Sequence, residues 1–329
     1  MRTWLCGTIV FLFLYSVHPL AAAERPKVVA YVPNWIDLQA YSQKIDYAQL
    51  THINLAFENP TSDDGDLSFH AKDDLIIRQA REHGVKILVS IGGGSAATNA
   101  TLKPRYFRLI STAKRADFVK KLAAYVAVHQ LDGLDVDIEG PSINADYGPF
   151  VEALSTALHA QHKLLSAALS QGYGGKSVPD AALKQFDFVN IMAYDAAGPW
   201  KPNSPGQPSS FEFSQKCVAY WLKRGLPNAN AVLGIPFYGY DFGASGGAKS
   251  VPFSQIVKAQ PDAAQKDQIG DKLFYNGIPT IKKKAQSVLD QKLGGVMIWS
   301  LNDDAAGDDS LLKAIAETLA PQPAPRPAK

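Results

Sequence analysis

The sequence is poor in cysteine and nearly balanced in charge. It has two cysteines in 329 residues, and one of them, Cys6, lies in the apolar segment at the N-terminus. If that segment is removed, Cys217 remains alone, so no disulfide can form within the chain and a large packed core must hold it together. We interpret Cys217 as a buried packing residue of a helix. The formal net charge of +2 gives no electrostatic reason to expect a nucleic acid as partner.

Residues 1–23 have the composition of a secretory signal peptide. A charged N-terminus precedes an apolar run that ends in the small residues Ala21–Ala23, as in a cleavable export signal. A membrane anchor is the alternative, but the run is short for a membrane span. We expect cleavage after Ala23 and a secreted or periplasmic protein with no membrane attachment. At the other end, residues 321–329 form a proline-rich tail.

Between residues 24 and 320, short β-rich runs alternate with helical patterns. The expected strands are 27–33, 51–57, 85–91, 131–140, 164–169, 186–193, 231–237 and 295–301. The expected helices are 73–83, 116–129, 147–162, 213–224, 279–292 and 311–319. Near-continuous apolar strands that alternate with helices indicate a parallel sheet buried on both faces.

An open doubly wound sheet and a closed barrel both satisfy this pattern. No Gly-x-Gly-x-x-Gly motif follows the first strand, and eight strand–helix repeats in roughly 300 residues suit a barrel. We therefore predict an α/β fold, a (β/α)8 TIM barrel formed by residues 24–320, with its active site at the C-terminal ends of the strands. Residues 243–278, after strand seven, are too long for a simple turn and are interpreted as a small insertion at the rim.

Acidic and apolar residues alternate in segment 131–140. Asp135, Asp137 and Glu139 fall on one face of the expected strand, with about 6.6 Å between neighbours. Three carboxylates this close cannot all be ionised, so at least one holds a proton near neutrality, as a general acid must. Asp132 falls on the other face and is interpreted as structural. A solvated acidic edge strand and a metal site are the alternatives.

Three motifs stand on the expected strands in the order Ser90-Ile-Gly92-Gly93, Asp132-Gly-Leu-Asp135-Val-Asp137-Ile-Glu139 and Met192-Ala-Tyr194-Asp195. They match the SxGG, DGxDxDxE and MxYD motifs of glycoside hydrolase family 18, the chitinase family. The chain resembles a bacterial-type secreted catalytic domain of that family from Val28 to about Leu319.

The resemblance implies hydrolysis of β-1,4-linked N-acetylglucosamine polymers or oligomers such as chitin, with net retention. Most glycosidases place two carboxylates across the scissile bond, whereas here the acids lie along one strand, on one side of the substrate. The 2-acetamido group of the substrate would then attack the anomeric carbon. Glu139 would act as the general acid/base, while Asp137 would hold the acetamide and share a proton with Asp135.

The other expected site residues lie near the same strand ends. Tyr194 is expected to act with the catalytic carboxylates. The expected substrate-binding residues are Asp195, Met192, Tyr238, Trp299, Trp35, Tyr31, Phe57, Gly93 and Trp200. By the resemblance, Trp299 would be the floor of the subsite for the sugar to be cleaved, and Tyr238 would lie near the acetamide.

Two other functions stay open. One is an endo-β-N-acetylglucosaminidase on N-glycan cores or a relative acting on peptidoglycan, although the intact Met192–Asp195 motif favours chitin. The other is a chitin-binding lectin, against which the presence of Glu139 argues. We expect a monomer that needs no cofactor and no metal, since His159 and His162 share a helical pattern but have no third ligand in view.

Overall fold

The protein was analysed as a computed structural model, which describes residues 25–245 and 247–320. The predicted signal peptide and proline-rich tail lie outside these described residues. Eight parallel strands close into a barrel in the order β1-β12-β7-β6-β5-β4-β3-β2. They are β1 (Lys27–Pro33), β2 (His52–Ala56), β3 (Lys86–Gly92), β4 (Gly133–Asp137), β5 (Leu164–Leu169), β6 (Phe188–Ile191), β7 (Ala231–Pro236) and β12 (Gly295–Trp299). The predicted (β/α)8 barrel is confirmed.

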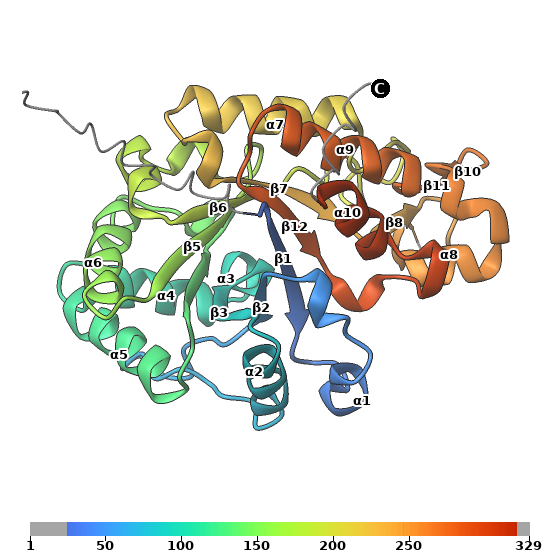
Figure 1. Cartoon of the computed structure of the whole chain (residues 1–329). Coiled ribbons are helices and arrows are strands. Elements are labelled where there is room, and N and C mark those ends of the chain that lie inside the picture. Colours follow the sequence, from blue (N-terminus) through green and yellow to red (C-terminus); the bar gives the residue numbers. More distant parts are fainter. Residues whose placement is uncertain (1–24, 246, 321–329) are drawn as a thin grey trace, which may run out of the picture.

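Helices cover the outside of this barrel (Figure 1). They are α1 (Leu38–Ser42), α2 (Asp73–Glu82), α3 (Gly94–Thr98), α4 (Leu102–Ile110), α5 (Arg115–Val128), α6 (Tyr147–His159), α7 (Phe211–Lys223), α9 (Ile278–Asp290) and α10 (Leu311–Leu319). The sequence did not predict α1, α3 or α4. A run of glycines leads into α3, and Pro104 lies in the first turn of α4, where the missing N–H of proline costs no helical hydrogen bond.

Apolar side chains fill the space on both sides of the barrel wall. Leu134 and Val136 of β4 point outward and pack against the surrounding helices. Strand alternation therefore turns Asp135 and Asp137 inward, toward a second apolar group that fills the barrel interior. Cys217 is buried on α7, as predicted.

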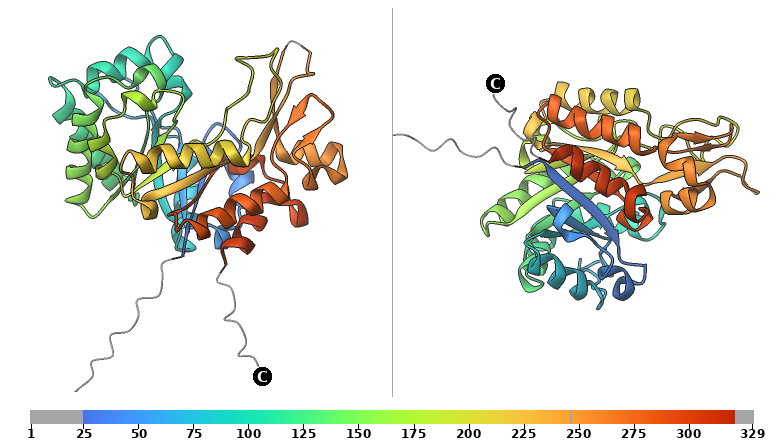
Figure 2. Two further views of the ribbon diagram at one scale, coloured as in Figure 1. Left: turned by 90° about the horizontal axis from the view of Figure 1, so that it is seen from above. Right: turned by 45° about the vertical axis from the view of Figure 1, so that its right-hand side comes forward.

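A second, four-stranded antiparallel sheet follows β7, in the order β10-β11-β8-β9. Its strands are β8 (Tyr238–Asp241), β9 (Lys249–Pro252), β10 (Gln268–Ile269) and β11 (Leu273–Phe274), and α8 (Phe253–Ala259) lies with them. This insertion projects to one side of the barrel (Figure 2). It begins at Tyr238, earlier than the predicted 243–278. The boundary was missed because residues 231–241 form one apolar and aromatic run, and Phe237 alone separates the two sheets.

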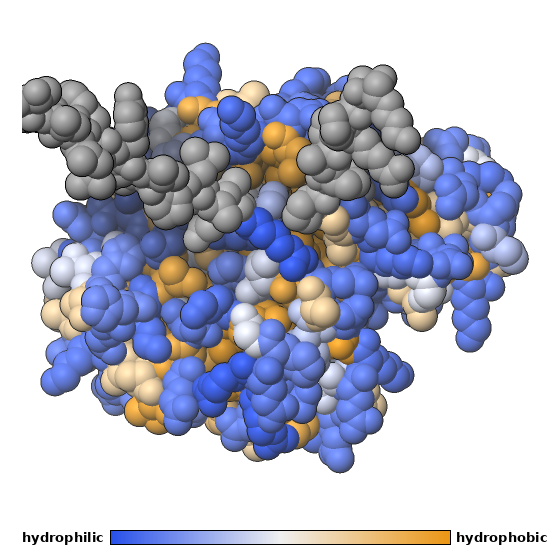
Figure 3. All heavy atoms as spheres, viewed as in Figure 1, coloured by the Kyte–Doolittle hydropathy of each residue, from blue (hydrophilic) through white to orange (hydrophobic). Residues whose placement is uncertain are grey.

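The surface shown in Figure 3 is mostly hydrophilic, with apolar residues in small separate groups. Within residues 25–245 and 247–320, no helix has the length and apolar character needed to cross a membrane.

Candidate active site

Asp135 lies at the centre of a hydrogen-bond network inside the barrel. Its Oδ2 accepts hydrogen bonds from the hydroxyls of Tyr31 and Ser90, each 2.7 Å away. Its Oδ1 accepts from Ser166 Oγ at 2.6 Å and from Asn190 Nδ2 at 3.3 Å. Burial raises the pKa of Asp135, and these four donors act against that shift because they stabilise the carboxylate.

Asp137, the next acid on the same face, has no comparable set of donors. Its side chain is buried, and its Oδ1 has no hydrogen-bond partner among the residues that the structure describes. Burial, and then the charges of Glu139 and Asp135, raise the pKa of Asp137 well above its ordinary value. Of the two buried aspartates, Asp137 is therefore the one that favours holding a proton, and its Oδ1 can pair with a group that a ligand brings.

Glu139 follows the end of β4, where the extended backbone continues the alternation of the strand. Burial, and then the negative charge of Asp195, raise the pKa of Glu139 to about 7. A large fraction of Glu139 is therefore protonated near neutral pH, as a general acid requires.

Asp195 follows β6 and is held by two tyrosines of the insertion. The hydroxyls of Tyr238 and Tyr240 both donate hydrogen bonds to Asp195 Oδ1. The Tyr240 oxygen lies 2.9 Å from Oδ1. Tyr194, the neighbour of Asp195, is buried, and its hydroxyl lies 3.9 Å from Met297 Sδ. The insertion thus supplies part of the site, because β8 brings two aromatic donors to the end of β6.

Three aromatic rings form a row at the ends of β1, β2 and β12. Phe57 stacks on Trp299 with 5.8 Å between ring centroids, and Trp35 stacks on Phe57 with 6.2 Å between centroids. Trp35 is 63% exposed, so one ring face is available to the apolar face of a ligand. Gly93 lies against the row, since a Cβ there would stand 2.5 Å from the Phe57 ring.

Tyr31 and Met192, both expected to bind substrate, are buried inside the barrel. Tyr31 is 1% exposed and directs its hydroxyl at Asp135, while Met192 belongs to the apolar group inside the barrel. The Tyr31 hydroxyl thus helps to hold the Asp135 carboxylate in place. Trp200 is 53% exposed and packs edge-on against Tyr240, with 5.8 Å between ring centroids.

Two aromatic residues near the site, Tyr173 and Tyr240, were not predicted from the sequence. Tyr173 follows β5 and is 45% exposed. A Cβ on Gly140 would stand 2.2 Å from the Tyr173 ring, which places this ring beside the residue that follows Glu139. Its signal in the sequence is an aromatic residue between two glycines, directly after a strand.

The alternatives for the acidic run are not supported. β4 pairs with β3 and β5, so it is not an edge strand. Asp132 accepts from Lys86 Nζ at 2.9 Å and from a backbone N–H of β3, which agrees with a structural role. Within the described part of the chain, the side chains placed closely enough to hold a metal ion are Glu58, His70 and Asp73, and not the carboxylates of β4.

Comparison with known proteins agrees with this geometry. The family model described as glycosyl hydrolases family 18 matches residues 27–304. The solved structure of a family 18 chitinase, ChiB of Flavobacterium johnsoniae, is 36% identical and superposes with a TM-score of 0.84 over 90% of this chain and 94% of that chain. A chitinase of Bacteroides thetaiotaomicron is 25% identical, with a TM-score of 0.78 over 90% of this chain and 97% of that chain.

Similar curated proteins include enzymes and chitinase-like proteins. A chitinase-like effector of Moniliophthora roreri is 30% identical over 74% of this chain and 65% of the relative. Chitinase-3-like protein 2 of Homo sapiens is 25% identical over 92% of this chain and 91% of the relative. The probable chitinase 10 of Drosophila melanogaster is also 25% identical, but the match spans only 16% of that protein.

Proposed function

The chain belongs to family 18 of the glycosyl hydrolases, and on that premise we propose that it is a chitinase-like hydrolase of β-1,4-linked N-acetylglucosamine polymers. The observation that carries this proposal is the inward row of Asp135, Asp137 and Glu139. In this row the first acid has four donors, the second has a free oxygen, and the third has a pKa of about 7.

Each acid has a separate role in the proposed reaction. Glu139 donates its proton to the glycosidic oxygen as the bond to the leaving sugar breaks. The acetamide carbonyl oxygen of the substrate attacks the anomeric carbon and closes an oxazolinium ring. Asp137 accepts the acetamide N–H at its free Oδ1 while its proton moves toward Asp135, so that negative charge lies near the ring as it forms.

The second half of the reaction reverses these proton movements. Water attacks the anomeric carbon, Glu139 removes its proton, and the acetamide is restored. Two displacements at the same carbon leave the product with the configuration of the substrate.

Asp195 is the carboxylate that could otherwise act as a nucleophile. Its Oδ1 accepts from both Tyr238 and Tyr240, and such donors reduce the charge available for attack. This arrangement supports a role for Asp195 in orienting the substrate and in raising the pKa of Glu139.

Product masses test the substrate class. The wild-type protein should release short N-acetylglucosamine oligomers from chitin oligosaccharides, and it should leave a high-mannose glycoprotein and cell-wall sacculi intact. Release of a glycan from the glycoprotein would identify an endo-β-N-acetylglucosaminidase, and release of fragments from sacculi would identify a peptidoglycan hydrolase. Binding of chitin oligosaccharides with no cleavage would identify a lectin, which is the second candidate because a chitinase-like protein that is not named as an enzyme is 30% identical to this chain.

We also propose that the protein is exported. The support is the composition of residues 1–23. N-terminal sequencing of the protein from its native host should begin at Glu24, whereas a first residue of Met1 would contradict cleavage.

A further inference from the structure

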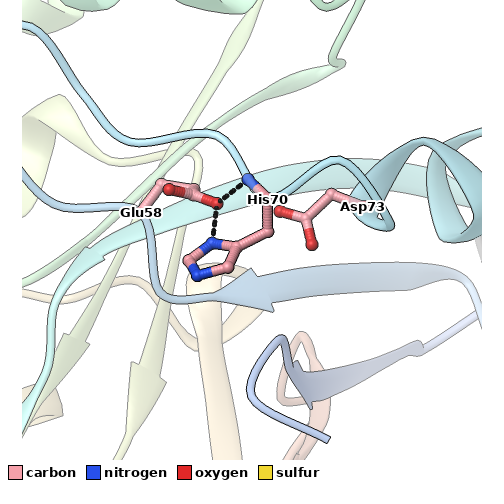
Figure 4. A group of neighbouring side chains, drawn as sticks. All are labelled: Glu58, His70 and Asp73. Atoms are coloured by element: carbon pink, nitrogen blue, oxygen red, sulfur yellow. Dashed lines mark hydrogen bonds and ion pairs between the residues drawn. The ribbon is translucent and has the colours of Figure 1, made fainter. Parts of the chain in front are cut away.

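A second group of titratable side chains lies outside the row of acids on β4. Glu58, His70 and Asp73 each offer one possible ligand atom, and these atoms all lie within 4.8 Å of one another (Figure 4). Glu58 follows β2, His70 lies in the loop before α2, and Asp73 is the first residue of α2. The reaction proposed above uses none of them.

Several close polar contacts hold the His70 ring against Glu58. Its Nδ1 is 2.6 Å from Glu58 Oε1 and 2.9 Å from Asn34 Nδ2, which is also 3.1 Å from Glu58 Oε1. Glu58 Oε1 also accepts a hydrogen bond from the backbone N–H of His70 at 2.9 Å. These contacts hold the Glu58 and His70 side chains next to each other, on the side to which Asp73 points.

Asp73 is independently left without partners. Asp73 is 1% exposed. Within the described part of the chain, neither of its carboxylate oxygens has a hydrogen-bond partner. A buried carboxylate without donors is costly unless positive charge compensates it. In Figure 4 the carboxyl group of Asp73 points toward the other two side chains.

We propose that Glu58, His70 and Asp73 bind one divalent cation, and that Zn²⁺ fits this ligand set. One imidazole and two carboxylates suit zinc, whereas Ca²⁺ and Mg²⁺ prefer oxygen ligands alone. Three protein ligands leave the fourth tetrahedral position to water. Glu58 Oε1, His70 Nδ1 and an Asp73 oxygen would then all face positive charge, which gives the buried Asp73 carboxylate a partner.

The Glu58–His70 pair needs only a small adjustment to bind zinc. Ligand atoms of a tetrahedral zinc site with bonds of about 2.0 Å stand about 3.3 Å apart. Glu58 Oε1 and His70 Nδ1, now 2.6 Å apart, must therefore separate by less than about 1 Å. The His70 side chain is 51% exposed and belongs to a loop, so its ring is free to make this shift.

A cation here would fasten the loop between β2 and α2 behind the aromatic row. Glu58 directly follows Phe57, and Asn34, which contacts both Glu58 and His70, directly precedes Trp35. Phe57 and Trp35 stack on each other. Cation binding would thus stabilise the segment that positions these two rings.

Titration of the full-length, chelator-treated protein tests the proposal. Calorimetry should show one equivalent of Zn²⁺, with binding that raises the thermal unfolding midpoint, and Ca²⁺ should bind far more weakly. His70→Ala and Asp73→Asn each remove a direct ligand and should weaken Zn²⁺ binding by about 100-fold or more. Both variants should fold, because His70 is exposed and asparagine has the shape of aspartate.

His159→Ala is the matched control. It removes another half-exposed histidine, whose Nε2 lies 3.0 Å from a carboxylate oxygen of Asp187, and it should leave Zn²⁺ binding unchanged. An anomalous diffraction signal at the zinc edge between Glu58 and Asp73 would support the site.

Absence of stoichiometric Zn²⁺ binding to the wild type would overturn the proposal. Equal affinity in His70→Ala and the wild type would overturn it as well. Cation binding is independent of the proposed hydrolase function, because these titrations need no substrate and do not touch Glu139.

Discussion

The hydroxyl of Tyr31 on β1 lies 2.7 Å from Oδ2 of Asp135 on β4 and joins the two strands through the barrel interior. Their positions are 104 residues apart in the chain. Together with Ser90, Ser166 and Asn190, Tyr31 favours the ionised form of Asp135 and so leaves the proton of the pair to Asp137.

Replacement of Tyr31 by phenylalanine should therefore affect catalysis without any lost sugar contact. We expect the free energy of unfolding to fall by about 1.5–3 kcal/mol, because a buried carboxylate loses one donor. We also expect the acidic limb of the kcat/KM profile to move to higher pH, because one fewer donor stabilises ionised Asp135. The measurements are urea unfolding and kcat/KM against pH.

Tyr147→Phe is the matched control for that variant. Tyr147 is also fully buried, but its hydroxyl has no partner among the described residues. Its removal should be neutral or stabilising by up to about 1 kcal/mol, with an unchanged pH profile. Equal losses in both variants would contradict the role assigned to Tyr31.

Glu139 should make both activity and stability fall as the pH rises. Its pKa of about 7 means that kcat/KM falls as the pH rises above this value, because the general acid loses its proton. The folded-state pKa exceeds the ordinary value of 4.5, so the folded protein binds more protons than the unfolded chain between these two values. The contribution of Glu139 to the free energy of unfolding therefore decreases as the pH rises from 4.5 to about 7.

Glu139→Gln removes both effects. Turnover should fall by about 100- to 10,000-fold while oligosaccharide binding remains. Above pH 7 the variant should be more stable than the wild type, because no buried charge forms at this position. Urea unfolding at pH 5 and pH 8 measures the difference, and the same pH dependence in both proteins would contradict the assigned protonation.

Asp195→Asn should move the alkaline limb of the kcat/KM profile to lower pH, by up to about one unit, because a negative charge that raises the pKa of Glu139 is lost. The substitution also lowers kcat/KM at every pH, but the pH at which the alkaline limb falls to half its maximum does not depend on that loss. Asp66→Asn, which removes an exposed carboxylate paired with Lys121, should leave the limb in place. An unmoved limb in Asp195→Asn would show that Asp195 does not influence the acid.

Gly93→Ala should weaken binding of chitin oligosaccharides, because the new Cβ would displace the Phe57 ring from its place between Trp35 and Trp299. Gly84 has the same φ of +71°, but nothing lies within 4 Å of a Cβ built there. Gly84→Ala should therefore lose about 1 kcal/mol of stability from backbone strain and keep its affinity. Titrations followed by tryptophan fluorescence would show the difference, and equal affinity in the two variants would argue against a role for the aromatic row.

The sequence was sufficient to predict the barrel and the row of acids because both depend on local periodicity. Leu134, Val136 and Ile138 alternate with the carboxylates, so the face of each acid follows from strand geometry. The pairing of Tyr240 with Asp195 could not be predicted in this way. It joins residues 45 apart through a second sheet whose start no turn signal marks.

The group of Glu58, His70 and Asp73 was missed for a related reason. The histidines that the sequence places close together are His159 and His162, and with no third ligand near them it gave no reason to expect a metal. Glu58 and His70 are 12 positions apart in the chain, and only the folded loop brings them together. Burial likewise cannot be deduced from residue type, so the sequence did not show that Tyr31, predicted to bind substrate, is buried against Asp135.

The most direct test of the proposed mechanism compares chitin hexasaccharide with the same hexamer after removal of its N-acetyl groups, followed by NMR of the anomeric protons during the first turnovers. The acetamide is the proposed nucleophile. We therefore predict rapid release of products with retained β-configuration from the acetylated hexamer, and no cleavage of the deacetylated hexamer although it still reaches Glu139. Cleavage of both hexamers at similar rates, or an inverted product from the first, would contradict catalysis by the acetamide.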